Sequence, residues 1–305
     1  MHIPQILDVT LRDGGYVNGH SWSLPDAQRI VRAAADAGIP SAEVGYFRPG
    51  RQRVDGDSHP AASCPPEYLE KLRATAAGAI TLVVMAVQKD VPPERYRDLA
   101  DHGVAMVRLP TPLSALGGLR RHVEAIHDAG LLASVNLTRA SELSLAQIRT
   151  VAAAADTSGA DVFYLADSNG SLFPQSVTEI VAAVRETTSV PLGFHAHDML
   201  SLAFGNSLAA LDAGCGHLDA SLGGLGKGGG NLCMELLVGY LRSRAGADLD
   251  IAPLVLASSD LVEPLRTVSW LASCESIVSG LLNLNLDEIS GMRAEGSLLD
   301  VLQRA

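Results

Sequence analysis

Two histidines separated by one residue, His195 and His197, stand at the end of an apolar run, residues 193–198 (GFHAHD). Residues i and i+2 of a β-strand point to the same side, so both imidazoles can reach one metal ion. Two neutral imidazoles need an acidic oxygen to complete a site for a divalent transition metal. Asp13 supplies one, because it follows another apolar run and precedes two glycines. The pattern predicts a metal site on these three side chains; the alternative is a pair of surface or core histidines that binds no metal.

Such a site leaves coordination positions open, so a substrate can bind the ion directly. The ligand types suit Mn²⁺, Mg²⁺, Co²⁺ or Zn²⁺, and we favour Mn²⁺ or Mg²⁺ if a 2-oxo acid chelates the ion through its carboxylate and ketone oxygens. The ion then stabilises an enolate as a Lewis acid. Arg12 is adjacent to Asp13 and permanently charged, so it could hydrogen-bond the same oxyanion. Asn231 follows a glycine-rich loop and is a fourth candidate ligand, or a contact of a substrate carboxylate; the alternative is a helix N-cap.

The elements that must position these residues alternate along the chain. Short β-rich runs are separated by Ala- and Leu-rich amphipathic stretches up to residue 244, which is typical of repeated βα units and a parallel sheet. The predicted strands are residues 5–10, 41–44, 81–85, 106–109, 132–136, 162–166, 192–195 and 217–221. The predicted helices include residues 26–37, 67–76, 119–129, 145–155, 177–186 and 200–213. Several of these helices stop at a glycine, among them Gly38, Gly130 and Gly214.

Eight such units predict a (β/α)8 TIM barrel. We expect a catalytic barrel at residues 1–245 and a C-terminal helical extension at 246–305, packed on the barrel or at an oligomer interface. The alternative fold is an open doubly wound sheet. It is disfavoured because no predicted strand is followed by the dinucleotide-binding pattern G-x-G-x-x-G at a helix start.

A barrel places its chemistry at the carboxyl ends of its strands, where the βα loops converge. Glu43 lies in the second predicted strand, and the ends of later strands carry Arg108, Asn136, Ser168 and Lys227. We expect Glu43 to act in catalysis and the other four to bind substrate. Each residue taken singly has a structural alternative, since a strand-end carboxylate often caps a helix and a strand-end arginine often pairs with it.

The three lysines argue against a Schiff-base aldolase. Lys71 lies on a predicted helix, Lys89 lies beyond the third strand, and Lys227 lies in the glycine-rich loop 222–231, so none is inside a barrel strand. A metal-dependent route is therefore favoured over an imine. We expect Lys227 to bind an anionic substrate; the alternative is a solvated loop lysine without a function.

The amino-acid composition limits the kinds of partner and site that the chain can have. The 305 residues are 47% hydrophobic with a mean hydropathy of +0.19, which suffices for a large core. A net charge of −11 without any Lys/Arg run argues against nucleic acid or an anionic membrane surface as partner and favours a small molecule. Four cysteines without C-x-x-C spacing indicate neither disulfides nor a zinc knuckle. With a polar N-terminus and no apolar run of membrane-spanning length, the sequence predicts a soluble cytoplasmic protein.

These residues make the chain resemble the DRE-TIM metallolyase superfamily, which includes 3-hydroxy-3-methylglutaryl-CoA lyase, 4-hydroxy-2-oxovalerate aldolase and the isopropylmalate and homocitrate synthases. The matching motifs are residues 8–15 (DVTLRDGG), 43–44 (EV), 167–170 (DSNG), 195–198 (HAHD) and 224–231 (GLGKGGGN), in family order. The resemblance implies a barrel with a divalent metal on Asp13, His195 and His197, with Asn231 nearby and Arg12 stabilising an enolate. It also implies that a carbon–carbon bond next to a 2-oxo acid or acyl thioester is made or broken, and it suggests a homodimer formed through the C-terminal helices.

Departures from the family leave the general acid or base unassigned. The hydroxy-oxovalerate aldolases have a catalytic histidine three residues after the metal aspartate, where this chain has Tyr16, and a C-terminal catalytic tyrosine, whereas no tyrosine follows Tyr240. The methylglutaryl-CoA lyases have a catalytic cysteine in the glycine loop, where residues 222–230 contain none. Tyr16 is the first candidate, and His20 and Glu43 are the others. The alternatives are that Tyr16 packs on its loop and that His20 is solvated.

The leading hypothesis is a divalent-metal-dependent aldolase or lyase that forms the enolate of a pyruvate-like 2-oxo acid and adds it to, or releases it from, an aldehyde. One alternative is a Claisen-type acyltransferase that joins an acyl-CoA to a 2-oxo acid. Another is a barrel that binds a ligand or a partner without turnover. Residues 47–66, with Arg48, Arg51 and Arg53, are predicted to form a lid over an anionic substrate, or else a long disordered loop.

Overall fold

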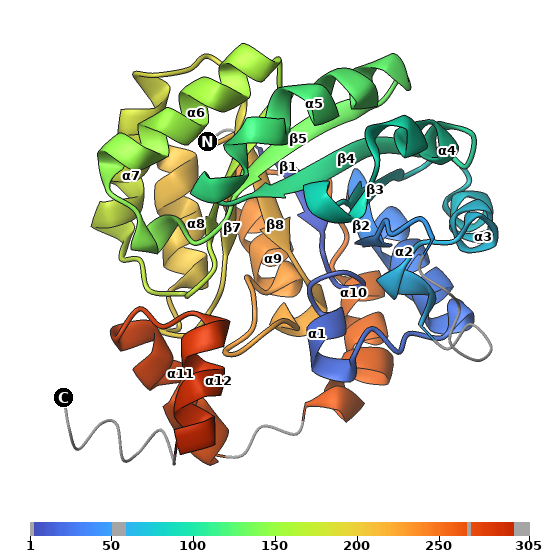
Figure 1. Cartoon of the computed structure of the whole chain (residues 1–305). Coiled ribbons are helices and arrows are strands. Elements are labelled where there is room, and N and C mark those ends of the chain that lie inside the picture. The colour runs from blue at the N-terminus through green and yellow to red at the C-terminus, as the bar shows by residue number, and fades with distance from the viewer. Residues whose placement is uncertain (1–2, 51–58, 267–269, 296–305) are drawn as a thin grey trace.

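Parallel strands close into an eight-stranded barrel in the described part of the chain (Figure 1). The computed structural model describes residues 3–50, 59–266 and 270–295. The strands are β1 (Gln5–Asp8), β2 (Ser41–Tyr46), β3 (Thr81–Met85), β4 (Val104–Thr111), β5 (Leu132–Leu137), β6 (Val162–Asp167), β7 (Leu192–Ala196) and β8 (His217–Ala220). Each strand pairs with its neighbours in chain order, and β1 pairs with β8 to close the ring. The predicted (β/α)8 barrel is confirmed.

Helices follow the strands and surround the barrel (Figure 1). They are α1 (Gly15–Asn18), α2 (Leu24–Asp36), α3 (Pro66–Ala76), α4 (Arg97–Ala100), α5 (Leu119–Asp128), α6 (Leu145–Ser158), α7 (Pro174–Arg185), α8 (Ala203–Asp212) and α9 (Met234–Ala245). Local sequence explains several of their ends. Ser144 and Gln147 form a capping box at the start of α6. As predicted, glycines with positive φ follow the last turns of α2, α5 and α8, namely Gly38 (82°), Gly130 (76°) and Gly214 (108°).

Several predicted boundaries differ from the structure by one to three residues, and two of the errors have a clear local reason. β1 ends at Asp8 rather than Thr10, because the Asp8 carboxylate accepts hydrogen bonds from the backbone N–H and the hydroxyl of Thr10. α8 begins at Ala203 rather than Leu200, because Asp198 Oδ1 accepts a hydrogen bond from the Ala203 N–H at 2.8 Å. Both carboxylates turn the chain out of a strand and into a loop that carries candidate site residues.

Alternation along the strands decides which side chains fill the barrel. In β2, Ala42 and Val44 belong to the apolar layer between the strands and the helices, whereas Glu43 lies on the inner side. In β8, Leu218 packs in the same outer layer, and Asp219 points inward to meet an arginine of β4. Charged groups from β2, β4 and β8 therefore occupy part of the barrel interior, beside a small apolar cluster of Leu7, Val9 and Val83.

The chain continues after the barrel as helices α10 (Ala252–Ala257), α11 (Trp270–Leu281) and α12 (Leu286–Glu295). In Figure 1, α11 and α12 lie at the same end of the barrel as α1. Side-chain amides fix the corner between them, because Asn169 Nδ2 donates to Asn283 Oδ1 (3.0 Å) and Asn283 Nδ2 donates to the Ser141 carbonyl (3.0 Å). None of the described helices combines the length and apolar character needed to cross a membrane. The predicted domain boundary at residue 245 stays a prediction.

Candidate active site

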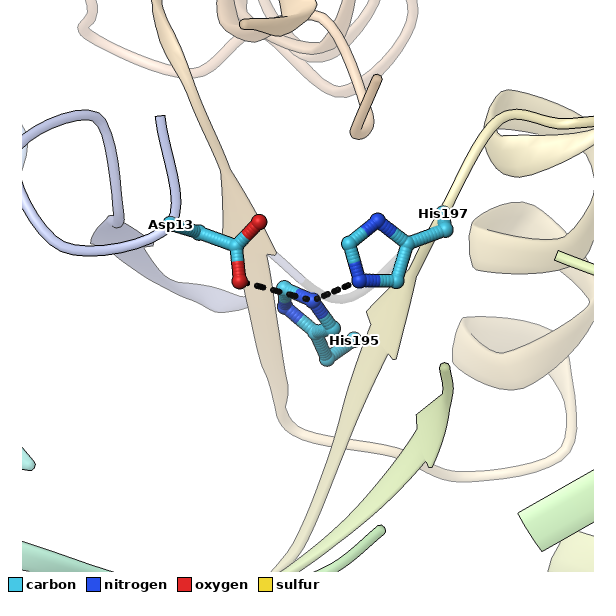
Figure 2. Close-up of side chains that lie close together, drawn as sticks. All are labelled: Asp13, His195 and His197. Carbon is cyan, nitrogen blue, oxygen red and sulfur yellow. Dashed lines mark hydrogen bonds and ion pairs between the residues drawn. The ribbon is translucent and has the colours of Figure 1, made fainter. Parts of the chain in front are cut away.

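Three predicted metal ligands meet at the carboxyl ends of β1 and β7 (Figure 2). Asp13, His195 and His197 are buried, and one ligand atom from each lies within 4.8 Å of the others. The Nε2 atoms of the two histidines are 3.4 Å apart, and His195 Nε2 lies 3.8 Å from Asp13 Oδ2. Ligand atoms that bind one ion at right angles, each about 2.1 Å from it, are about 3.0 Å apart. The spacing therefore fits a shared divalent cation.

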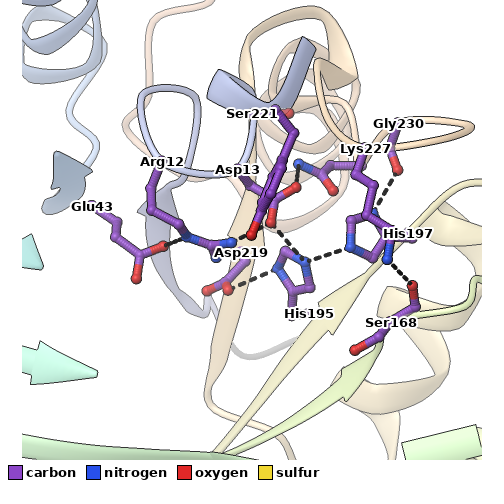
Figure 3. Close-up of polar contacts among 12 residues, drawn as sticks. Arg12, Asp13, Glu43, Ser168, His195, His197, Asp219, Ser221, Lys227 and Gly230 are labelled. Carbon is purple, nitrogen blue, oxygen red and sulfur yellow. Dashed lines mark hydrogen bonds and ion pairs between the residues drawn. The ribbon is translucent and has the colours of Figure 1, made fainter. Parts of the chain in front are cut away.

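Hydrogen bonds orient both imidazoles toward this point (Figure 3). His195 Nδ1 lies 3.0 Å from Asp219 Oδ2, and His197 Nδ1 lies 3.1 Å from the Gly230 carbonyl oxygen. Each acceptor holds the ring proton on Nδ1, which leaves the Nε2 lone pair free for a ligand. Burial lowers the pKa of His197 to about 3, so this ring is neutral, as metal ligation requires.

Asn231 lies beside the three ligands and has an unused acceptor. Its Nδ2 donates to Asp13 Oδ1 (3.2 Å) and to the Leu225 carbonyl (3.0 Å), whereas its buried Oδ1 has no partner among the described residues. A buried oxygen without a hydrogen-bond donor lowers the stability of the folded state, and coordination of a cation by this oxygen would remove that cost. The alternative role as a helix N-cap is wrong, because α9 begins at Met234 with Cys233 in the capping position.

A buried ion-pair network surrounds Arg12. Its Nη1 pairs with Asp13, and its Nε donates to Glu43 Oε2 at 2.6 Å. Burial alone would raise the pKa of Asp13, but the charges of Arg12 and the histidines hold it well below its usual range. Glu43 is fully buried, and its Oε2 also forms an ion pair with Arg108 Nη1 at 3.2 Å. Two guanidinium groups therefore hold the carboxylate of Glu43 inside the barrel, away from the surface of the cavity described below.

Arg108 forms the floor of the site together with groups from three other strands. Its Nη2 donates to Asp219 Oδ2 at 2.6 Å, and its guanidinium carbon lies 4.3 Å from the centre of the Tyr164 ring. With the Asn136 amide turned so that its oxygen faces Arg108, that oxygen accepts from Nη2 (2.6 Å) and Nε (3.0 Å). Asp219 was not predicted from the sequence; its signal was a carboxylate in a short strand, on the opposite side from Leu218 of the apolar outer layer.

A cavity of about 870 Å³ lies at this end of the barrel. Most of the predicted site residues line it, namely Arg12, Asp13, Tyr16, Arg108, Asn136, Ser168, His195, His197 and Lys227. Glu43, His20 and Asn231 are not among the lining residues. The volume is in the range of small-molecule sites and exceeds what a three-carbon oxo acid fills.

Lys227 reaches the cavity from the glycine-rich loop after β8 (Figure 3). Its ammonium donates to the Ser168 carbonyl at 3.3 Å, and burial lowers its pKa. The Ser168 hydroxyl accepts a hydrogen bond from the Arg139 N–H at 2.9 Å. Backbone contacts therefore hold both side chains at the wall of the cavity, and Lys227 forms no ion pair with the described residues.

Tyr16 and His20 form an aromatic group with a residue that sequence reasoning missed, Tyr46. The hydroxyl oxygens of Tyr16 and Tyr46 are 2.7 Å apart, and both side chains line the cavity. The His20 ring packs edge-on against both tyrosine rings, at 5.2 and 5.6 Å between centroids. Burial lowers the pKa of His20 to about 4, so it is neutral at pH 7. The alternative of a freely solvated His20 is wrong.

The two glycines after Asp13 are required by the close packing of this turn. A Cβ on Gly14 would lie 2.3 Å from the Thr10 carbonyl oxygen, and one on Gly15 would lie 2.2 Å from His20 Nδ1. Neither distance is tolerated by non-bonded atoms, so the glycines let Arg12 and the aromatic group approach the same side of the cavity.

The predicted lid is described only in part. Arg48 lies with its guanidinium carbon 4.5 Å from the centre of the Tyr46 ring. Arg51 and Arg53 lie outside the described residues.

Comparisons with known proteins identify similar chains. The family model described as HMGL-like matches residues 111–262. The 4-hydroxy-2-oxovalerate aldolase of Geobacillus genomosp. 3 is 32% identical over 285 residues, covering 90% of this chain and 82% of that protein. The protein of the same name from Roseiflexus sp. is 29% identical over 313 residues, covering 100% of this chain and 90% of that protein.

Solved structures share the fold. The crystal structure of the N-terminal domain of a Bacteroides vulgatus protein has a TM-score of 0.84 and 27% sequence identity, covering 99% of this chain and 100% of that one. The carboxyl transferase domain of Rhizobium etli pyruvate carboxylase with pyruvate has a TM-score of 0.72 and 20% identity, covering 87% of this chain and 48% of that one. The second likeness concerns the fold alone.

Proposed function

The chain belongs to the DRE-TIM metallolyase superfamily, and on that premise we propose the reaction and the residues that carry it. It is a divalent-metal-dependent carbon–carbon lyase of the aldolase type, which acts through the enolate of a 2-oxo acid. The observation that carries the proposal is the group of Asp13, His195 and His197, whose ligand atoms meet in a cavity at the carboxyl ends of the barrel strands.

Asp13, His195 and His197 would hold the metal, with the unpartnered Oδ1 of Asn231 as a fourth ligand. We favour Mn²⁺ or Mg²⁺ over Co²⁺ or Zn²⁺, because two of the four donors are oxygens and the substrate adds two more. When bound, the ion supplies Lewis-acid stabilisation of the negative charge on the enolate oxygen.

Arg12 would stabilise the same charge. Two of its three nitrogens are bound to Glu43 and Asp13, which fixes the guanidinium against the wall of the cavity. In the described part of the chain, its Nη2 has no acceptor and can donate to a substrate oxygen. Glu43 acts by holding Arg12 rather than by transferring a proton.

The substrate carboxylate would contact the remaining cationic and polar groups of the cavity, which are Arg108, Asn136, Ser168 and Lys227. Lys227 is the best placed for an ionic contact, because its ammonium has no carboxylate partner among the described residues.

Tyr16 would move the proton. In cleavage, the hydroxyl of the 4-hydroxy-2-oxo acid gives its proton to the Tyr16 oxygen while the half-exposed Tyr16 passes its own proton to solvent, from which it is later regained. The bond between C3 and C4 breaks, and C4 becomes the aldehyde carbon. The electron pair of that bond passes into the enolate, which then takes the proton back at C3 to give the 2-oxo acid. One proton leaves and one returns, so no other reagent is needed.

The test is the release of pyruvate from 4-hydroxy-2-oxovalerate on addition of Mn²⁺. The Tyr16→Phe variant should lower kcat by about 10²-fold, in the range typical of lost acid–base catalysis. Tyr68→Phe is the matched control, since its buried hydroxyl donates to the Val44 carbonyl at 2.9 Å and does not line the cavity. An unchanged kcat in Tyr16→Phe would remove Tyr16 from the mechanism. Release of free thiol from an acyl-CoA with a 2-oxo acid, without aldol cleavage, would favour a Claisen-type acyltransferase instead.

We also propose a homodimer formed through the C-terminal helices, a separate extension at residues 246–305, and a cytoplasmic location. Strongly exposed leucines support the first, among them Leu256 (69%) and Leu281 (63%). The four cysteines form no disulfide, as is usual in a reducing compartment. Light scattering tests the dimer, and a monomeric mass would contradict it.

A further inference from the structure

Two tyrosine hydroxyls from different parts of the chain meet at the wall of the cavity. Tyr16 belongs to the four-residue helix α1, and Tyr46 is the last residue of β2. Their oxygens are 2.7 Å apart, which is the length of a good O–H···O hydrogen bond. The two residues differ sharply in exposure, because Tyr16 is 46% exposed and Tyr46 is 6% exposed.

The His20 ring packs edge-on against both tyrosines, at 5.2 Å from Tyr16 and 5.6 Å from Tyr46, so this contact does not distinguish them. Tyr16 lies on a short helix with its ring half-exposed, and among the described residues its hydroxyl bonds Tyr46, so without this bond the side chain is freer to change rotamer. Tyr46, by contrast, is buried, and the Arg48 guanidinium carbon lies 4.5 Å from its ring centre. The rigid member of the pair is therefore the one that can position the other.

The direction of the hydrogen bond follows from burial. Burial raises the pKa of the Tyr46 hydroxyl far above its ordinary range, so Tyr46 keeps its proton throughout the reaction. It is then the donor whenever the Tyr16 oxygen carries negative charge, which a hydrogen bond from a neutral hydroxyl stabilises.

We propose that Tyr46 is a positioning residue that acts through Tyr16: its hydroxyl donates to the Tyr16 oxygen and fixes that oxygen at the cavity wall during proton transfer. This inference rests on the proposed function, in which Tyr16 exchanges the proton. Tyr16 takes the proton of the substrate hydroxyl as it passes its own proton to solvent, and it returns a proton to C3 of the enolate. Tyr46 gains and loses no proton in the cycle.

A double-mutant cycle with Tyr16→Phe and Tyr46→Phe tests the proposal. Two rates are measured, namely Mn²⁺-dependent cleavage of 4-hydroxy-2-oxovalerate and exchange of the C3 protons of pyruvate in D₂O followed by NMR. We expect Tyr46→Phe to lower both rates by roughly 10-fold, with KM and Mn²⁺ content unchanged. In the Tyr16→Phe background, Tyr46→Phe should cause no further loss, because it has no oxygen left to position.

Controls separate this role from a structural one. Tyr68→Phe also removes a buried tyrosine hydroxyl next to β2 and should leave both rates unchanged. Losses that multiply in the double variant, or a Tyr46→Phe variant with wild-type rates, would overturn the role of Tyr46 while leaving the proposed function in place. A wild-type protein without Mn²⁺-dependent cleavage or exchange would overturn the proposed function itself, and the role of Tyr46 with it.

Discussion

Asp219→Asn should weaken metal binding although Asp219 is not one of the candidate ligands. Its Oδ2 accepts from His195 Nδ1 at 3.0 Å and from Arg108 Nη2 at 2.6 Å. Burial alone would raise the pKa of Asp219, but the charge of Arg108 and the contact with His195 lower it, so the group is an anion at pH 7. Asparagine removes this charge and offers one acceptor oxygen in place of two. The proton of His195 is then no longer held on Nδ1, and the Nε2 lone pair is lost in part of the molecules.

The magnitude follows from this contact. Loss of the carboxylate that orients a ligating histidine typically costs 10–100-fold in metal affinity, which corresponds to about 1.4–2.7 kcal/mol. The measurement is the dissociation constant for Mn²⁺ by isothermal titration calorimetry, with the thermal midpoint recorded to confirm that the variant is folded.

A second aspartate of the chain supplies a matched control. Asp161 Oδ2 also lies near a histidine and accepts a backbone N–H, at 2.9 Å from His127 Nε2 and 2.7 Å from the Ala133 nitrogen, but it is remote from the cavity. Asp161→Asn should leave the dissociation constant within about twofold. A folded Asp219→Asn variant that binds Mn²⁺ as tightly as the wild type would show that Asp219 does not orient His195 for metal binding.

Three further predictions concern activity and stability. Arg12→Lys should lower kcat by about 10²–10³-fold with metal content retained, because one ammonium cannot replace the fixed guanidinium donor; an unchanged kcat would contradict this. Gly14→Ala should lower the thermal midpoint, because its Cβ would lie 2.3 Å from a carbonyl oxygen, whereas Gly117→Ala, with no atom within 4 Å, should not; equal midpoints would contradict this. Burial raises the pKa values of Asp8 and Asp167 from 3.8 to about 6. Protonation therefore favours the folded state, and lowering the pH from 7.5 to 5 should increase the free energy of unfolding by about 1.4 kcal/mol per group, measured by urea denaturation; no increase would contradict this.

The fold was predictable because its signals are local. Alternating apolar runs, capping residues and terminal glycines mark each βα unit, and none of these signals depends on distant parts of the chain. The spacing of His195 and His197 predicted their common direction for the same reason. Asp13 could be joined to them because all strands of a parallel barrel end at the same side.

The charged floor of the site could not be predicted in the same way. Arg108 and Asp219 come from β4 and β8, and their contact depends on the closure of the barrel rather than on sequence spacing. The sequence predicted Glu43 as a candidate acid or base, but Glu43 is buried below the cavity. Strand alternation indicates which side of the sheet a residue faces, but not how far it lies from the carboxyl ends of the strands. The partner of Tyr16 was missed because Tyr46 lies beyond a complete helix, α2, and the contact depends on how the chain returns from α2 into β2.

The metal content of the protein shows whether Asp13, His195 and His197 bind an ion. The wild type and the variant carrying both His195→Ala and His197→Ala are loaded with Mn²⁺, dialysed and examined by elemental analysis. We expect about one divalent ion per wild-type chain and almost none in the variant, since neutral imidazoles supply two of the ligands. A wild-type protein that retains no metal, or a folded variant that retains as much as the wild type, would contradict this.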